Sequence, residues 1–277
     1  MKKVFSLFLG LTLLSFLAAC GGGGGKNEPK ARAQAPEQAR AAAPGAYETI
    51  TVTDGGTIKG QVTFAGAIPQ KQKLEVTKDV NVCGKITHYK EDLVVSQNHG
   101  LANVVVHITN ISKGKGLDAL GESFVLNQHN CAFEPHVLLV AAGAECTILN
   151  SDGILHNIHT YSQKNPPINL AQPGFRKKMV QTFDEPEIFR IACDVHNWMG
   201  GYIAVAGNPY YAVTDANGNF ELTDVPAGTY TLEYWQETLG TKTAEVTVPA
   251  GGVVEANMEF VPGSASKDEA DQLASNN

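Results

Sequence analysis

The run Cys193-Asp-Val-His196-Asn-Trp-Met199 is the feature that most constrains the fold. The flanking residues 188–192 and 201–205 are short apolar runs with the composition of strands. A thiolate, an imidazole and a thioether would therefore share one tight loop between two strands. These soft ligands suit copper that cycles between two oxidation states, whereas structural zinc seldom recruits Met and usually needs paired thiolates. The run thus predicts a metal-binding loop within β-structure.

A second imidazole is needed to complete such a site, and His156 is the candidate. It begins the run His156-Asn-Ile-His159, near the end of a strand that starts at about Cys146. One strand end of a β-sandwich can face a loop that is distant in the sequence, so this imidazole can reach the Cys/His/Met loop. Each residue alone has a simpler interpretation, because buried Cys and Met are commonly core residues. Their order and spacing together favour one mononuclear copper ion held by His156, Cys193, His196 and Met199.

These motifs resemble those of amicyanin and plastocyanin, which are small blue copper proteins. The short Cys-x-x-His-x-x-Met loop and the His-Asn-Ile-His run are nearer to amicyanin, and the lead-in to the first His matches the family at Phe133, Pro135, Gly143 and Asn150. The resemblance spans about residues 121–205 and implies a Greek-key cupredoxin β-sandwich. It also implies a trigonal plane of two imidazoles and one thiolate, with a long axial thioether.

The same resemblance implies roles for residues beside the ligands. Asn157 is expected to form a hydrogen bond to the Cys193 loop and to steady it. His196 is expected nearest the surface, as the port for electrons. Trp198 and Met199 would supply an apolar docking patch beside it.

The C-terminal third has a signature of its own. Residues 215–220 fit the pattern Asp-x-x-Gly-x-Phe, and residues 225–230 read Val-Pro-Ala-Gly-Thr-Tyr. Both resemble the carboxypeptidase regulatory-like domain, a small transthyretin-like β-sandwich. The opening strands of that family are absent just upstream of Tyr210, but residues 60–62 and 102–104 fit them.

Two arrangements of the domains follow. One regulatory-like sandwich is split, with the copper domain inserted between about Gly121 and Gly207, or three β-modules follow one another; the split form is slightly favoured. Both are all-β. The boundaries are a signal peptide at 1–20, a flexible linker at 21–46, an N-terminal β segment at 47–120, a cupredoxin domain at 121–206, the regulatory-like sandwich at 207–262 and a disordered tail at 263–277.

The N-terminus reads as a targeting segment. Lys2 and Lys3 precede a short apolar stretch that ends in Leu-Ala-Ala-Cys20, which resembles a bacterial lipobox. The resemblance implies cleavage before Cys20 and a lipid on its sulfur; the alternative is an ordinary signal peptide. By analogy with bacterial lipoproteins, Gly21 instead of Asp after the cysteine favours outer-membrane sorting, so the expected location is the periplasmic side of the outer membrane or the cell surface.

Export leaves four cysteines in an oxidising compartment, where disulfides persist. If Cys193 binds metal, the simplest arithmetic is one disulfide and one free thiol among Cys83, Cys131 and Cys146. The pairing of Cys83 with Cys131 is preferred, although the sequence by itself does not fix it.

Three further groups carry weaker signals. His129 and His136 flank Cys131 and could assemble a second metal site, but ordinary polar packing is the preferred interpretation. The basic run at residues 176–178 is either a solvated turn or a docking site for an acidic redox partner. His159 follows the first metal ligand and is expected not to bind metal.

The formal net charge is −7, and loss of Lys2 and Lys3 would leave 19 basic against 28 acidic residues, a net −9. Such a surface repels phosphate backbones, which argues against a nucleic-acid partner. The sequence has no phosphate-binding loop or nucleophile elbow, and its eight His are few for a multicopper enzyme. The expected function is one-electron transfer between redox proteins, with copper handling or a surface binding module as alternatives.

Overall fold

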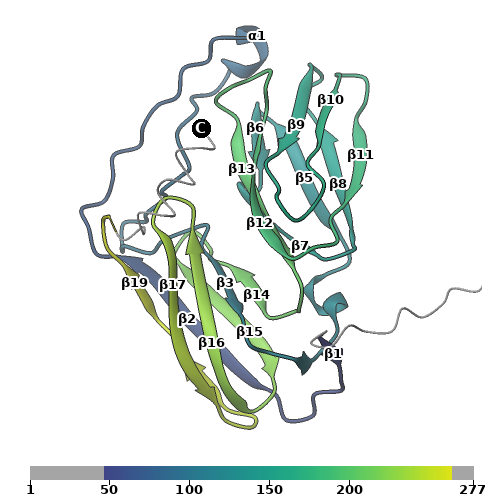
Figure 1. The fold of residues 1–277 in the computed structure, drawn as a ribbon. Coiled ribbons are helices and arrows are strands. Elements are labelled where there is room, and N and C mark those ends of the chain that lie inside the picture. The colour runs from purple at the N-terminus through teal and green to yellow at the C-terminus, as the bar shows by residue number, and fades with distance from the viewer. Residues whose placement is uncertain (1–46, 264–277) are drawn as a thin grey trace, which may run out of the picture. The chain divides into compact units, whose positions relative to one another are not determined.

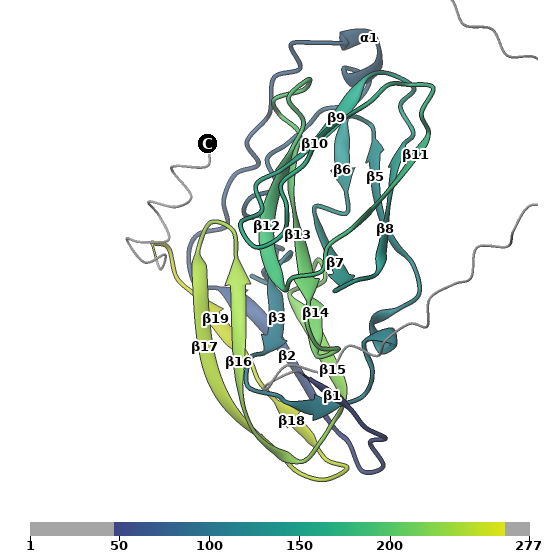
Figure 2. The same ribbon diagram turned by 45° about the vertical axis from the view of Figure 1, so that its right-hand side comes forward.

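The computed structural model describes residues 47–263, and their regular secondary structure is almost entirely β-strand (Figures 1 and 2). The helical elements among them are one turn, α1 (Val80–Cys83), and one 3-10 turn, η1 (Leu117–Leu120). Neither is long and apolar enough to cross a membrane. The predicted all-β fold class is confirmed. The predicted signal peptide, the proposed lipid-bearing Cys20, the predicted linker and the tail from residue 264 lie outside the described residues.

A first sandwich carries the predicted metal ligands. Its larger sheet has the order β10-β9-β12-β13-β7 and its smaller sheet the order β11-β8-β5-β6. The strands of the larger sheet are β7 (Val137–Ala141), β9 (His156–Thr160), β10 (Asn169–Gln172), β12 (Glu187–Ala192) and β13 (Gly200–Ala206). The strands of the smaller sheet are β5 (Phe124–His129), β6 (Ala132–Glu134), β8 (Glu145–Asn150) and β11 (Lys178–Thr182).

Period-two patterning explains why these segments pair as sheets. Side chains along β5 and β8 alternate between buried and partly exposed, so one face of each strand enters the core. Leu126, Ile148 and Ile203 are fully buried in that core. Cys146 lies there as a free thiol, and burial raises its pKa to about 12, so it stays protonated and inert.

A second sandwich joins segments from both ends of the chain. One sheet has the order β14-β3-β16-β17, and in the other β2 pairs with β15, β18 and β19. The strands are β2 (Gly56–Phe64), β3 (Val105–Ile108), β14 (Tyr211–Val213), β15 (Asn219–Val225), β16 (Gly228–Gln236), β17 (Gly240–Val248), β18 (Val253–Glu255) and β19 (Met258–Phe260). The pairs β2–β15 and β3–β16 unite residues before 121 with residues after 207 in single sheets. A separate two-stranded ladder pairs β1 (Glu48–Thr49) with β4 (Lys113–Gly114).

The turn within the regulatory-like signature depends on the Asp and the Gly of its Asp-x-x-Gly-x-Phe pattern. The Asp215 carboxylate accepts hydrogen bonds from the backbone N–H groups of Asn217 and Asn219, at 2.8 and 2.9 Å. Gly218 has φ of +80°, and a Cβ there would lie 2.2 Å from the carbonyl oxygen of Val62. Glycine is therefore required both by the backbone conformation and by the neighbouring strand.

Residues 65–104, here called the connecting segment, run between β2 and β3 with little regular structure. A disulfide between Cys83 of α1 and Cys131 ties this segment to the β5–β6 turn of the first sandwich. The pairing preferred from the sequence is thus present. His88 Nε2 lies 2.8 Å from the carbonyl oxygen of Cys83 and holds the same part of the segment.

Candidate metal centre

Strand β12 brings the distant halves of the site together. Its last residue, Ala192, pairs with Gly200 of β13 and with His159 of β9. The loop of residues 193–199 therefore begins where β12 ends, beside the start of β9. This pairing places His156 next to a loop that lies 37 residues further along the chain.

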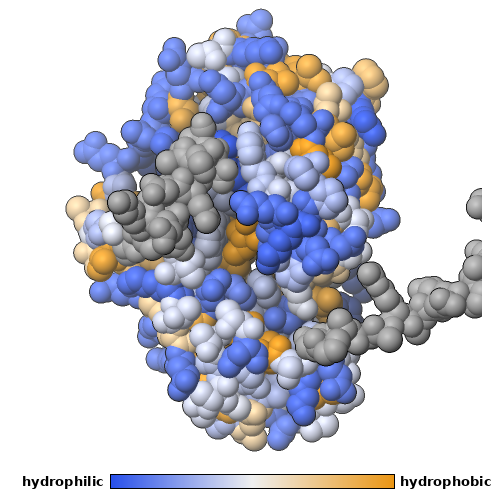
Figure 3. Space-filling model, in the orientation of Figure 1, coloured by the Kyte–Doolittle hydropathy of each residue, from blue (hydrophilic) through white to orange (hydrophobic). Residues whose placement is uncertain are grey.

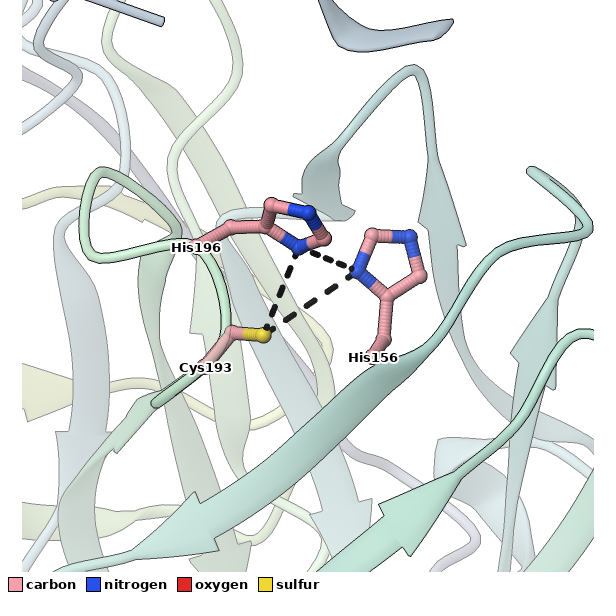
Figure 4. A group of neighbouring side chains, drawn as sticks. All are labelled: His156, Cys193 and His196. Atoms are coloured by element: carbon pink, nitrogen blue, oxygen red, sulfur yellow. Dashed lines mark hydrogen bonds between the residues drawn. The ribbon is translucent and has the colours of Figure 1, made fainter. Parts of the chain in front are cut away.

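Three predicted ligand atoms face one another in this place (Figure 4). The Sγ of Cys193 lies 3.8 Å from the Nδ1 of His196 and 4.0 Å from the Nδ1 of His156, and the two nitrogens are 3.0 Å apart. For metal–nitrogen bonds of about 2.0 Å and metal–sulfur bonds of about 2.3 Å, a trigonal ion needs nitrogen–sulfur distances of about 3.8 Å. All three side chains are buried. The donor types and the two nitrogen–sulfur distances therefore fit a single soft metal ion, with the two nitrogens closer together than in an ideal trigonal plane.

Met199, the fourth predicted ligand, closes the loop. Its backbone N–H donates to the carbonyl oxygen of His196 at 2.9 Å, and its carbonyl oxygen accepts from the N–H of Cys193 at 3.2 Å. Its side chain is buried in the same core as Cys193. The tight turn thus keeps the Met and Cys backbones together.

The surroundings of Cys193 shift its thiol toward the thiolate form. Burial raises the pKa of its thiol, but hydrogen bonds from His156 and from the backbone N–H of Asn157 outweigh burial and lower that pKa. The Asn157 side chain also spans the gap to the loop: its Oδ1 accepts from the N–H of Asp194 at 2.6 Å. The resemblance to blue copper proteins predicted a hydrogen bond from Asn157 to the Cys193 loop, and this contact is present.

A carboxylate lies behind each imidazole. The Nε2 of His156 is 2.9 Å from an oxygen of Asp152, and the Nε2 of His196 is 2.9 Å from an oxygen of Asp79. Burial lowers the pKa of His156, but its bonds to Asp152 and Cys193 outweigh burial and raise that pKa to about 8. Burial also lowers the pKa of His196, and the nearby charge of His156 lowers it further against the opposing effect of Asp79.

Sequence reasoning missed both carboxylates. Asp152 precedes His156 by four residues and could have been noticed as a neighbour. Asp79 lies 117 residues before His196, and no local pattern announces that contact.

His196, the ligand expected nearest the surface, is not exposed to solvent. Its side chain is 0% exposed, because Asp79 covers its outer nitrogen and the ring of Trp198 lies 5.1 Å from its ring centre. Met199 is likewise buried, so it contributes nothing to an exposed docking patch. The disulfide-held connecting segment supplies the cover that the sequence did not reveal.

The second metal site considered at His129 and His136 does not assemble. His129 pairs with Glu134 at 3.1 Å, while His136 pairs with Glu237 of the second sandwich. Within residues 47–263, the groups that could hold a metal are His156/Cys193/His196 and Cys131/Asp152/His156. The latter is no ligand set because Cys131 is consumed by the disulfide. His159 belongs to neither group and pairs with Asp194 at 3.1 Å.

The comparisons with known proteins cover parts of the chain. Residues 201–261 match the model of the carboxypeptidase regulatory-like domain, and no curated protein matches. The first residues of that span, 201–206, belong to β13, which pairs with strands of the first sandwich.

Among solved structures, a mutant of amicyanin in its oxidized state is 20% identical over 31% of this chain and 83% of its own, with a TM-score of 0.28. A purple cupredoxin from Nitrosopumilus maritimus is 20% identical over 31% of this chain and 100% of its own, with a TM-score of 0.26. A Cu-containing nitrite reductase from Thermus scotoductus SA-01 is 21% identical over 30% of this chain, with a TM-score of 0.29. The chain spans 22% of the length of that reductase. The chain is thus an all-β protein that contains a carboxypeptidase regulatory-like domain and has cupredoxins among its structural neighbours.

Proposed function

We propose that this chain is a type 1 copper protein that carries single electrons. The observation that carries the proposal is the buried convergence of His156 Nδ1, His196 Nδ1 and Cys193 Sγ (Figure 4). Copper bound there would supply a one-electron couple, with two imidazoles and a thiolate as equatorial ligands. Met199 is the proposed axial ligand, because it is buried on the same loop.

The way the ligands are held favours electron transfer over copper handling. Each of the three equatorial ligands is held by a hydrogen-bond partner. Asp152 holds His156, Asp79 holds His196, and the N–H of Asn157 holds Cys193. Ligands restrained in this way change little when the charge of the ion changes, which suits a fast carrier. A protein that delivers copper needs ligands that a recipient can reach, and here all three side chains are buried.

The proposed partner is a redox protein with an acidic docking face. Leu155, which directly precedes His156, is 45% exposed, and Phe175 is 87% exposed. The two loops that carry them touch, since a Cβ on Gly174 would lie only 2.0 Å from the carbonyl oxygen of Gly153.

The basic run 176–178 follows Phe175 directly. Hydrophilic residues predominate on the face drawn in Figure 3, and the chain as a whole carries −7. On this acidic protein, an apolar tip beside a positively charged run fits a partner that presents negative charge at its docking face. Electrons would then enter beside His156 rather than through the covered edge of His196.

The proposed location is the periplasmic side of the outer membrane or the cell surface, with a lipid on Cys20. The support is the sequence pattern that ends in Leu-Ala-Ala-Cys20. Growth with a radiolabelled fatty acid should label the chain, and Cys20→Ala should abolish the label and release the protein in soluble form.

Metal analysis combined with visible absorption tests the copper proposal. The purified chain should bind one copper ion and turn blue on oxidation, and Cys193→Ser should remove the colour. Cys146→Ser is the matched control, because this thiol is free and belongs to neither group of described residues that could hold a metal. The oxidised protein should exchange electrons rapidly with a small redox dye. A colourless protein that still binds copper, or slow exchange with tight retention of Cu(I), would favour copper handling; a protein without metal would favour a binding module.

A further inference from the structure

Asp79 is the N-cap residue that precedes the single turn α1, but its side chain does not cap that turn. An Asp at this position ordinarily accepts a hydrogen bond from the first free N–H groups of a helix. Here the side chain makes no capping bond, and the residue has φ of 48° and ψ of 39°, in the left-handed region. Its carboxylate is directed to the Nε2 of His196 instead, at 2.9 Å. Asp79 thus lacks both a capping hydrogen bond and a right-handed backbone conformation, and its carboxylate contacts a proposed metal ligand instead.

We infer that Asp79 is a positioning residue of the metal centre, which covers and orients His196 and tunes the proposed copper site toward its oxidised state. This inference rests on the proposed function. A carboxylate bonded to the outer nitrogen of a ligating imidazole fixes the ring and raises its basicity as a ligand. Added negative charge near a buried ion favours the more positive of its two oxidation states.

Asp152 makes the same contact with His156, but the two carboxylates differ in how they are held. The Asp152 side chain is 5% exposed, and it also accepts hydrogen bonds from the backbone N–H groups of Asn130 and Cys131. The Asp79 side chain is 38% exposed and comes from outside the first sandwich. Asp152 is therefore built into the sandwich, whereas Asp79 depends on the placement of the connecting segment.

The disulfide fixes that placement. Cys83, four residues after Asp79, is bonded to Cys131, and its backbone N–H donates to the carbonyl oxygen of Asp79 at 2.9 Å. Cys131 is held in turn, since its N–H donates to Asp152 and its carbonyl oxygen accepts from the Nε1 of Trp198 at 3.2 Å. The disulfide thus ties the turn that carries Asp79 to Cys131, whose backbone N–H binds Asp152.

Measurement of the reduction potential tests the inference. Asp79→Asn keeps the shape and an accepting oxygen but removes the charge. Binding of Cu(II) relative to Cu(I) should therefore weaken about tenfold, which raises the reduction potential by about 59 mV for one electron. Asp79→Glu should recover part of the shift, and Asp152→Asn should shift the potential in the same direction. Asp54→Asn, an exposed change in the second sandwich, is the control for net charge. A blue Asp79→Asn protein with the potential of the wild type would overturn the tuning role.

A copper-free measurement tests the cover separately from the proposed function. Diethyl pyrocarbonate should leave His196 unmodified in the wild-type chain but modify it in Asp79→Ala and in the double variant Cys83→Ala/Cys131→Ala. Exposed His129 serves as the internal reference for reagent activity. A colourless wild type would defeat the copper proposal, whereas equal protection of His196 in all variants would defeat the covering role.

Discussion

Removal of the Cys83–Cys131 disulfide should destabilise the protein by an amount that loop entropy sets. The bond closes a sequence separation of 48 residues. For a loop of this length, the chain-entropy relation gives a stabilisation of about 4 kcal/mol at 25 °C, by constraining the unfolded chain. The double variant Cys83→Ala/Cys131→Ala should lower the free energy of unfolding by that amount, with a further cost of about 1 kcal/mol for each emptied core position.

Urea unfolding of the copper-free chain measures this loss, and the two tryptophans locate it. Trp198 lies in the metal-binding loop and Trp235 on β16 of the second sandwich. Trp198→Phe and Trp235→Phe therefore leave one fluorescent reporter in each sandwich. If the sandwiches unfold together, both reporters should shift equally; if they unfold separately, the Trp198 transition should move further.

Cys146→Ala is the control, because it empties a core position without opening the disulfide. A double variant that loses no more stability than this control, with both reporters agreeing, would refute the entropic reasoning. It would mean that the connecting segment is held by its other contacts, such as the one between His88 and the Cys83 carbonyl oxygen.

Three further predictions concern pH, the loop and the docking surface. Burial lowers the pKa of His107 to about 4, whereas its value in the unfolded chain is near 6.5. Between these two pH values only the unfolded chain takes up the proton, so the free energy of unfolding should fall by roughly 3 kcal/mol as the pH decreases across that window. His107→Gln should remove this pH dependence from the variant, so the difference in unfolding free energy between wild type and variant should change by roughly 3 kcal/mol across the window. A wild-type slope retained in the variant would contradict the assignment. Asn157→Ala removes the bond to the N–H of Asp194 and should weaken copper binding about 10-fold to 100-fold, measured by competition with a chelator; unaltered affinity would show that the bridge is dispensable. Phe175→Ala should slow electron exchange with an acidic redox protein but not with a small neutral dye, as followed by stopped-flow absorbance; equal slowing with both would point to an altered copper site instead.

Local spacing determined much of the site from the sequence. Cys193, His196 and Met199 occupy one short loop, so their proximity follows from the chain itself once flanking strands are recognised. The Asp215 turn is equally local, because its bonds to Asn217 and Asn219 span four residues at most. Burial of the alternate residues of β5 and β8 follows from their period-two patterns in the same way.

Contacts between distant segments became visible in the folded chain alone. The sequence left a split sandwich and serial modules open, and the pairing of β2 with β15 and of β3 with β16 has the split connectivity. It likewise could not show that His136 pairs with Glu237 rather than with His129. The cover over His196 comes from Asp79 on an irregular segment, whose course is set by a disulfide and by packing. Periodicity and spacing encode contacts between neighbours in the chain, whereas a contact across 117 residues depends on how every intervening element folds and so leaves no local pattern to read.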